Sequence, residues 1–512
     1  MLPPLRGVVL AVDVGYVEMC GRSVATSQGG KGSPRMKIML SRNCHIRQFG
    51  PYTHVFNHVT KADRTYEYAE IFATVLRRTP IDLDYAIRSV LYKYEDAEER
   101  IVAEDLRRFI GELVDCGCVI MANTEAELYQ KDLPFSYDAK MPSTSYLDKS
   151  PADDDGHEKL HKYFEQHPSP FQIHFDLTSA CTEKCIHCYV PQNKHFYINT
   201  TKCFEVMDQL REVNGMSVTL SGGECMLHPD FDMIIRHARE CDFSISVLSN
   251  LTLCDMRKAE LLREMNVSLV QVSLYSMDPK IHDVITQVPG SFEKTKTAIE
   301  TLHALDVPVQ ISCPTMKANY RGYKAVLEYA KSMKMKAYTD FIIMARSDHT
   351  TDNLDNRLSI DETEEIIRMI AENEPEYKSA LKEDNRKLTP PEIRAEEPFC
   401  GVCIDSICLN ADGNYYACSG FQDYPLGNCY KQTLMDVWTK SPQVLYLRSL
   451  RGKAIPQCVH CVDREFCSTC LVRNFNETGD MLKVSKHFCD VARLNHMIVD
   501  EYRAKNGVNK LV

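Results

Sequence analysis

The chain lacks the features of several protein classes. It has no run of about eighteen consecutive apolar residues, the length that a membrane-spanning helix needs, and its apolar stretch 8–17 contains Asp13 and has no small-residue cleavage site behind it. Lysine and arginine number 60 against 71 aspartate and glutamate residues, whereas a nucleic-acid binder needs a basic face. These absences predict a cytoplasmic protein with no membrane span, no secretion signal and no nucleic-acid partner.

Tryptophan is also scarce, with one residue, but the 512-residue chain contains 22 cysteines. A chain of this length does not need disulfides to stabilise its core, and its 44% hydrophobic and 26% charged residues are ordinary for a globular protein. Many cysteines without a secretion signal indicate metal binding in a reducing compartment, and the cysteine spacing indicates which metal.

Periodicity and composition divide the chain into six segments. They are a flexible extension (1–35), a winged-helix-like domain (36–122), a proline-rich linker (123–168), a segment of alternating strands and helices (169–395), a cysteine-dense segment (396–492) and a C-terminal tail (493–512). In the linker we expect one short helix, around His157–Phe164.

The first domain is predicted to contain short strands and three helices. The strands are Lys37–Leu40, His45–Phe49, His54–His58 and Cys118–Met121, and the helices are Tyr66–Leu76, Leu83–Tyr94 and Ala103–Cys116.

The segment 169–395 is predicted to be α/β. Its strands are Gln172–Asp176, Ser217–Leu220, Ser244–Leu248, Leu269–Ser273, Pro308–Ser312 and Tyr338–Met344, with helices between them. Six successive βα units predict a parallel sheet with right-handed crossovers, a partial (β/α)6 TIM-like barrel.

Three cysteines follow the first strand of this barrel. Cys181, Cys185 and Cys188 lie within eight residues. Three thiolates bind three irons of a 4Fe–4S cluster and leave the fourth iron open to an exchangeable ligand. The alternatives are buried structural thiols or a zinc site that lacks a ligand, but structural zinc usually takes four protein ligands.

This loop has the spacing CxxxCxφC, with His187 in the φ place and Tyr189 after the last cysteine. It resembles the signature of the radical S-adenosylmethionine (SAM) superfamily. The resemblance implies that the three cysteines hold the catalytic 4Fe–4S cluster and that His187 and Tyr189 border bound SAM.

Further sequences after the strands are similar to that superfamily. Gly222-Gly223-Glu224 resembles its GGE motif, which implies that Glu224 receives the amino group of SAM. By the same resemblance Ser249, Asn250 and Ser273 contact the ribose and carboxylate of SAM. The alternative for these strand-end residues is capping by small polar side chains.

The cysteine-dense segment contains Cys400, Gly413 and Cys418, followed by Cys458-x2-Cys461-x5-Cys467-x2-Cys470 and Cys489. This pattern resembles the SPASM extension of radical SAM enzymes, which binds two auxiliary clusters. The last pair has two intervening residues where the family usually has three. Paired zinc knuckles are the alternative, but their gap of five residues is short against the ~15–20 of a zinc ribbon.

The resemblance assigns these cysteines to two 4Fe–4S clusters. The distal cluster would be held by Cys458, Cys461, Cys467 and Cys489, and the proximal cluster by Cys400, Cys418 and Cys470. The fourth proximal ligand is Cys403 or Cys408, and the spacing does not choose between them. The other cysteines are expected to be small core residues: Cys20, Cys44, Cys116, Cys118, Cys203, Cys241, Cys254, Cys313 and Cys429.

The last resemblance lies in the N-terminal domain, in the segment 47–52, in Phe72 and in the segment 109–119. These residues are similar to the precursor-recognition domain of ribosomal-peptide maturation systems. Such a domain adds a leader peptide as a strand beside its ribbon. The alternative, a winged-helix DNA binder, disagrees with the acidic composition.

Together the resemblances imply a radical SAM peptide maturase. A flavodoxin- or ferredoxin-type reductant would supply the electron that cleaves SAM to a 5′-deoxyadenosyl radical, and the auxiliary clusters would accept an electron from the substrate in a thioether or carbon–carbon crosslink. Peptide epimerisation, a sulfatase-maturase-like activity and a cluster-bearing scaffold that only presents a peptide are the alternatives. Sulfatase maturases carry an aspartate where this chain has Ser419.

Overall fold

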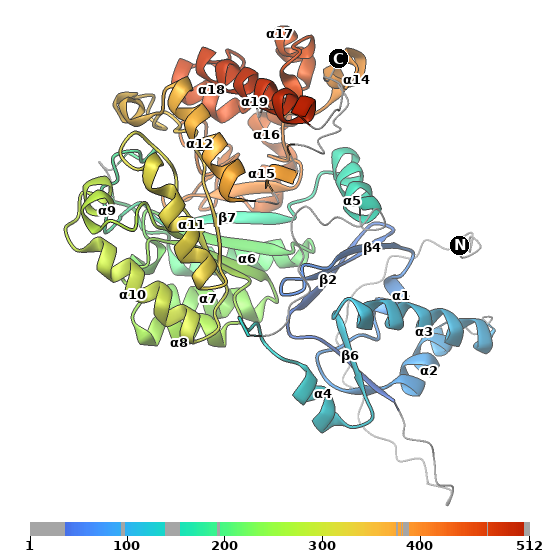
Figure 1. Cartoon of the computed structure of the whole chain (residues 1–512). Helices are drawn as coiled ribbons and strands as arrows, with labels where there is room; N and C mark the ends of the chain where they lie inside the picture. The colour runs from blue at the N-terminus through green and yellow to red at the C-terminus, as the bar shows by residue number, and fades with distance from the viewer. Residues whose placement is uncertain are drawn as a thin grey trace, which may run out of the picture. The chain divides into compact units, whose positions relative to one another are not determined.

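The computed structural model describes residues 36–93, 98–138, 154–191, 195–374, 377–379, 381, 389–467 and 469–505 (Figure 1). The predicted flexible extension, 1–35, lies outside these residues, as does 139–153 of the predicted linker. None of the helices in the described ranges is both long and apolar enough to cross a membrane.

The N-terminal domain contains two small antiparallel sheets, ordered β5-β1-β6 and β2-β3-β4, and helices that cover them. The elements are β1 (Lys37–Leu40), β2 (Cys44–Phe49), β3 (Tyr52–Asn57), β4 (Asp63–Glu67), α1 (Glu70–Ala73), β5 (Ile81–Asp82), α2 (Leu83–Lys93), α3 (Glu99–Asp115) and β6 (Val119–Ala122). Leu106, Ile110 and Leu113 lie on one face of α3 and are buried in the core of this domain. Two helices follow within the predicted linker, α4 (Glu125–Lys131) and the expected one, α5 (Asp154–Gln166).

The predicted helix Tyr66–Leu76 is wrong. Tyr66 belongs to β4 and pairs with Thr53 of β3, and only Glu70–Ala73 form a short helix. Thr65 and Tyr66 favour extended backbone, and pairing with β3 decides the conformation over the helical spacing of the apolar residues.

The α/β segment forms the predicted partial barrel. Its six strands are parallel and neighbour one another in chain order. They are β7 (Gln172–Thr178), β8 (Ser217–Gly222), β9 (Ser244–Ser249), β10 (Leu269–Ser273), β11 (Val309–Ser312) and β12 (Lys336–Tyr338). The helices are α6 (Thr200–Glu212), α7 (Phe231–Glu240), α8 (Met256–Glu264), α9 (Pro279–Thr286), α10 (Ser291–Ala304), α11 (Tyr323–Ser332) and α12 (Ile360–Asn373). The last strand was predicted at Tyr338–Met344 but ends at Tyr338.

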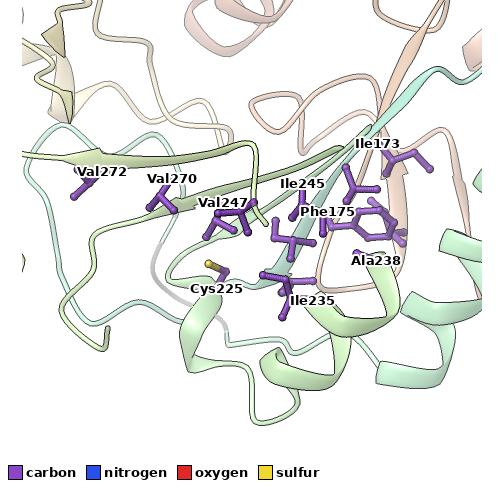
Figure 2. Close-up of a cluster of buried hydrophobic side chains, with 14 of the residues drawn as sticks. Ile173, Phe175, Cys225, Ile235, Ala238, Ile245, Val247, Val270 and Val272 are labelled. Carbon is purple, nitrogen blue, oxygen red and sulfur yellow. The ribbon is translucent and has the colours of Figure 1, made fainter. Parts of the chain in front are cut away.

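The two faces of this sheet differ because side chains alternate along a strand. One face is apolar: Phe175, Val247 and Val270 pack toward the helices, with Ile235 and Ala238 of α7 on the other side of the core (Figure 2). The opposite face carries polar side chains, His174, Asp176, Thr219, Gln271, Ser273, Gln310 and Ser312. The inner face of the partial barrel is therefore rich in hydrogen-bonding groups.

The C-terminal segment extends the same sheet. β13 (Ser406–Leu409) pairs in parallel with β7, and β14 (Asn414–Tyr416) and β15 (Gly427–Asn428) follow antiparallel. The helices here are α14 (Pro391–Glu396), α15 (Leu434–Lys440), α16 (Pro442–Ser449), α17 (Pro456–Val459), α18 (Leu471–Thr478) and α19 (Lys486–Lys505), which continues through most of the predicted tail. The cysteine-dense segment thus begins beside the strand that leads into Cys181.

One carboxylate joins the N-terminal domain to the barrel. Asp242, in the turn between α7 and β9, lies 3.3 Å from Arg47 Nη1 and 2.8 Å from Arg239 Nη2, and it also accepts a hydrogen bond from Arg78. Although burial alone would raise its pKa, hydrogen bonding with His45 and the nearby guanidinium charges hold the pKa of Asp242 well below its usual range. The turn is therefore an ionic joint between the two domains.

Asp242→Asn is expected to destabilise the protein by about 3 kcal/mol, because it leaves three guanidinium groups together without a compensating charge. Asparagine tolerates the left-handed backbone at this position, φ 59°, so the charge is what changes. The shift of the melting transition, followed by circular dichroism, measures the effect. The control is Glu264→Gln, which removes an exposed carboxylate paired with Arg236. This variant is expected to keep the wild-type melting temperature. Equal melting temperatures for the two variants would contradict a stabilising role of Asp242 between the domains.

Candidate functional site

The cysteines of the CxxxCxφC loop lie together after β7. Cys181, Cys185 and Cys188 are half-buried, and each thiol interacts electrostatically with the other two. The Cys188 N–H donates to the Cys185 carbonyl at 3.1 Å, and the N–H groups of Lys184 and Ile186 donate to carbonyl groups at the end of α9. A short, anchored loop thus presents three thiols, the donor set for a cluster with one open iron.

Hydrogen-bond donors surround these sulfurs. The Glu183 N–H lies 3.4 Å and the Asn250 amide nitrogen 3.7 Å from Cys181 Sγ, and the Tyr275 hydroxyl lies 3.6 Å from Cys185 Sγ. Such contacts orient metal ligands and tune a bound cluster. Burial raises the pKa of Cys181 to about 12, so thiolate formation at neutral pH is coupled to metal binding.

The two glycines of the GGE motif are required by close backbone contact. The Gly223 N–H donates to the Thr178 carbonyl at 2.7 Å, and the Glu224 N–H donates to the Ala180 carbonyl at 2.8 Å. A Cβ on Gly222, at φ 129°, would lie 2.2 Å from the Thr178 carbonyl oxygen, and a Cβ on Gly223 would lie 2.2 Å from that of Ala180. The motif therefore seats Glu224 directly against the entry to the cysteine loop.

Glu224 is fully buried at the ends of β8 and β9. Its carboxylate accepts hydrogen bonds from Ser249 Oγ at 2.8 Å, from the Asn250 N–H at 2.8 Å and from the Met226 N–H at 3.0 Å. Burial raises its pKa, and these donors are all neutral. A cation such as the α-ammonium of SAM is the partner that would stabilise the ionised carboxylate.

Two of the remaining residues expected at the SAM site lie beside Tyr275, which contacts the cysteine loop, and the third lies apart from them. Ser273 hydrogen-bonds to Tyr275, and the His187 ring lies edge-on to Tyr275 with centroids 5.1 Å apart. Burial lowers the pKa of His187 to about 4, so a neutral aromatic ring occupies the φ place. Tyr189 donates to Ser419 Oγ at 3.2 Å and thereby links the cysteine loop to the C-terminal segment.

Tyr275 is a residue of this site that the sequence analysis did not single out. It lies two positions beyond the end of β10, is 5% exposed, and contacts both the cysteine loop and Ser273. Its position just after a barrel strand is the signal that could have identified it.

The C-terminal cysteines fall into two groups in the structure. Cys458 interacts electrostatically with Cys461, Cys467 and Cys489. The second group contains Cys400, Cys418 and Cys470, with Cys418 interacting with both of the others. These are the groups expected for the distal and the proximal cluster, and their role as ligands stays a prediction.

Cys403 and Cys408 both lie beside the second group. Cys403 is buried, has a left-handed backbone (φ 61°) and interacts with Cys400. Cys408 is buried on β13 and interacts with Cys418. Proximity alone therefore leaves both as candidates for the fourth ligand.

Comparison with protein families finds a match in each half of the chain that contains cysteine loops. The radical SAM superfamily matches residues 176–330. The SPASM family, an iron–sulfur cluster-binding domain, matches residues 400–462.

Curated relatives cover a similar part of the chain. An AdoMet-dependent heme synthase of Methanosarcina barkeri is 26% identical over 344 residues, 62% of this chain and 95% of the relative. The subtilosin biosynthesis protein AlbA of Bacillus subtilis is 22% identical over 325 residues, 60% of this chain and 69% of the relative.

Among solved structures, Streptococcus suis SuiB bound to its precursor peptide SuiA has the same fold over 87% of this chain and 98% of its own, with a TM-score of 0.56 and 14% identity. The chain therefore contains a radical SAM domain and, after it, a SPASM iron–sulfur cluster-binding domain.

Proposed function

We propose that the chain is a radical SAM maturase that oxidatively crosslinks a ribosomally made precursor peptide, with one cluster on the three-cysteine loop and two auxiliary clusters. When bound to the reduced first cluster, SAM supplies a 5′-deoxyadenosyl radical able to remove hydrogen from an unactivated carbon. A flavodoxin- or ferredoxin-type protein is the proposed reductant. The main support for a peptide substrate is the N-terminal domain.

This domain ends its sheet β2-β3-β4 in the edge strand β4. In the described part of the chain β4 pairs with no further strand, but helix α5 packs against it, so a peptide strand would have to replace α5 or pair beside it. Addition of a peptide strand to such an edge gives affinity through backbone hydrogen bonds. Tyr68, directly after β4, and Tyr85 and Tyr92 of α2 are exposed aromatic side chains of the same domain.

The inner face of the barrel also suits a peptide. His174, Thr219, Gln271 and Gln310 alternate with the core residues along four strands and line the face opposite the helices. Side chains that donate and accept hydrogen bonds can satisfy the amide groups of a peptide backbone.

A second candidate is an activity like that of the AdoMet-dependent heme synthases, because their sequences match this chain well. The match covers 95% of the Methanosarcina relative but only 62% of this chain. More than a third of the chain thus lacks a counterpart there, and the peptide proposal gives the N-terminal domain a role that the heme-synthase candidate does not.

Ser419 bears on the type of peptide modification. It follows Cys418 and accepts the Tyr189 hydrogen bond, so this position holds a neutral hydroxyl and not a carboxylate base. This supports crosslinking over a sulfatase-maturase-like reaction. Epimerisation would require a hydrogen-donating thiol and no net oxidation.

The test is anaerobic coexpression with short open reading frames encoded nearby, followed by peptide mass spectrometry in normal and deuterated water. A loss of about two mass units, dependent on Cys185 when compared with Cys185→Ala, is the expected result of an oxidative crosslink. If the peptide instead gained deuterium from the solvent and lost no mass, the reaction would be epimerisation and the crosslinking proposal would be wrong. Unchanged peptides together with conversion of an iron porphyrin would overturn the proposal in favour of the heme-synthase candidate.

A further inference from the structure

Three side chains with metal-binding atoms meet on the outer surface of the barrel, away from the cluster loops. Asp208 comes from α6, and His237 and Cys241 lie one turn apart at the C-terminal end of α7. Asp208 is exposed and the other two are half-buried, so a cation and water can reach them.

The distances between the three ligand atoms are close to those in a tetrahedral zinc site. Asp208 Oδ1 lies 2.8 Å from His237 Nε2 and 3.5 Å from Cys241 Sγ, and the last two atoms are 3.6 Å apart. Zinc bonds of 2.0–2.3 Å place tetrahedral ligand atoms roughly 3.3–3.6 Å apart. Two distances already agree, and the oxygen–nitrogen pair has to open by about 0.5 Å.

The histidine is oriented as a metal ligand usually is. Its ring stacks on Phe204 of α6, with centroids 4.3 Å apart and an interplanar angle of 22°. Nε2 faces Asp208 and Cys241, while Nδ1 lies 3.8 Å from the Glu240 carboxylate on the opposite side. In many zinc sites a carboxylate accepts a hydrogen bond from the second ring nitrogen and fixes the tautomer, and Glu240 would have to move closer to do so here.

The site lies next to the ionic joint between the domains. Cys241 directly precedes Asp242, whose carbonyl accepts a hydrogen bond from Arg47 of the N-terminal domain. Arg47 Nε also donates, at 2.9 Å, to the carbonyl of Gly215, just beyond the end of α6. A cation bound by both α6 and α7 would therefore hold in place the carbonyl groups of Asp242 and Gly215, which accept hydrogen bonds from Arg47.

We propose that Asp208, His237 and Cys241 bind a zinc-class divalent cation and that the ion stabilises the surface on which the N-terminal domain docks. Because structural zinc usually takes four protein ligands, this three-residue site is of the open kind, with water as the fourth ligand. An imidazole, a thiolate and a carboxylate form a donor set suited to zinc. This site is separate from the iron–sulfur chemistry and does not depend on which substrate the enzyme modifies.

The test measures zinc binding by the full-length protein with its iron–sulfur clusters in place. Iron and sulfide are counted in every sample, and only samples with unchanged counts are compared. The expected result is about one zinc per chain, with one sulfur at about 2.3 Å and nitrogen or oxygen ligands at about 2.0–2.1 Å in zinc-edge X-ray absorption. Cys241→Ser and His237→Gln should each weaken binding at least ~30-fold. The control Cys254→Ser, which changes another half-buried thiol, should bind as the wild type does.

A wild-type dissociation constant weaker than about 100 μM, or zinc retention unaffected by Cys241→Ser and His237→Gln, would overturn the site and leave an ordinary Asp–His hydrogen bond beside a thiol. The structural role has its own readout, which is hydrogen exchange of peptides covering α7 and β2. Zinc should slow exchange in both peptides of the wild type and in neither peptide of Cys241→Ser. Binding without slower exchange in β2 would refute the docking role.

Discussion

Gly223→Ala is expected to lower 5′-deoxyadenosine formation by about 100-fold or more, the cost of a displacement of about 1 Å at a reacting centre. The added Cβ would lie 2.2 Å from the carbonyl oxygen and 2.6 Å from the carbonyl carbon of Ala180. Both are backbone atoms next to Cys181, so no flexible side chain can move aside. Relief of the clash requires the GGE turn and the cysteine loop to separate, which displaces Glu224 and breaks its 2.8 Å hydrogen bond to Ala180.

The measurement is anaerobic 5′-deoxyadenosine formation per chain with a chemical reductant, together with iron content and SAM affinity. Gly111→Ala is the matched control, because Gly111 is in the middle of α3 and a Cβ there would meet nothing within 4 Å. The control should leave SAM cleavage unchanged and stabilise the helix by about 0.5–1 kcal/mol. If Gly223→Ala kept more than half of the wild-type rate, the close contact would not be functionally required.

The parts of the structure that sequence reasoning predicted correctly are those encoded locally. The barrel strands are short segments, bounded by turns, in which apolar residues alternate with polar ones, the pattern of strands with one buried face. The three cysteines of the first loop are close in sequence, and a short loop keeps them close in space. The GGE motif is likewise local in sequence, but its two glycines contact the backbone carbonyl groups of Thr178 and Ala180, which the motif alone does not indicate.

The parts that were missed depend on contacts between distant segments. Tyr275 reaches Cys185 across 90 residues, and no local pattern encodes that meeting. β13 joins the barrel sheet through pairing with β7, more than 200 residues earlier in the chain. In the same way, Cys241 was expected to be a small core residue, because its neighbour Asp208 belongs to another helix.

The strand pair β7–β13 has a consequence for electron transfer. β7 leads into Cys181, while β13 carries Cys408 and precedes Cys418 by a short hairpin. Tyr189 and Ser419 connect the same two segments by a hydrogen bond. The first cysteine loop and Cys418 are therefore held at neighbouring strands of one sheet, which would favour the electron transfer proposed above.

Cys403→Ala is expected to remove about four irons per chain, whereas Cys408→Ala should remove none. Arg448 donates from Nε to the Cys403 carbonyl at 2.7 Å, and its guanidinium interacts electrostatically with the Cys403 thiol. Burial raises the pKa of Cys403 to about 12, but the Arg448 cation opposes this shift and favours the thiolate. Cys408 Sγ instead lies 3.9 Å from the buried carboxylate of Asp176, which disfavours a second negative charge.

Iron and sulfide counts on the purified anaerobic variants decide between the two cysteines, with Cys400→Ala as the positive control for loss of the proximal cluster. Loss of iron from Cys408→Ala but not from Cys403→Ala would reverse the assignment. Cys403→Ala should still cleave SAM, because the first cluster loop is intact, yet it should release peptide without the mass loss of a crosslink. That separation would identify the proximal cluster as the electron acceptor, since the radical would form and the substrate would have no site to which its electron could pass.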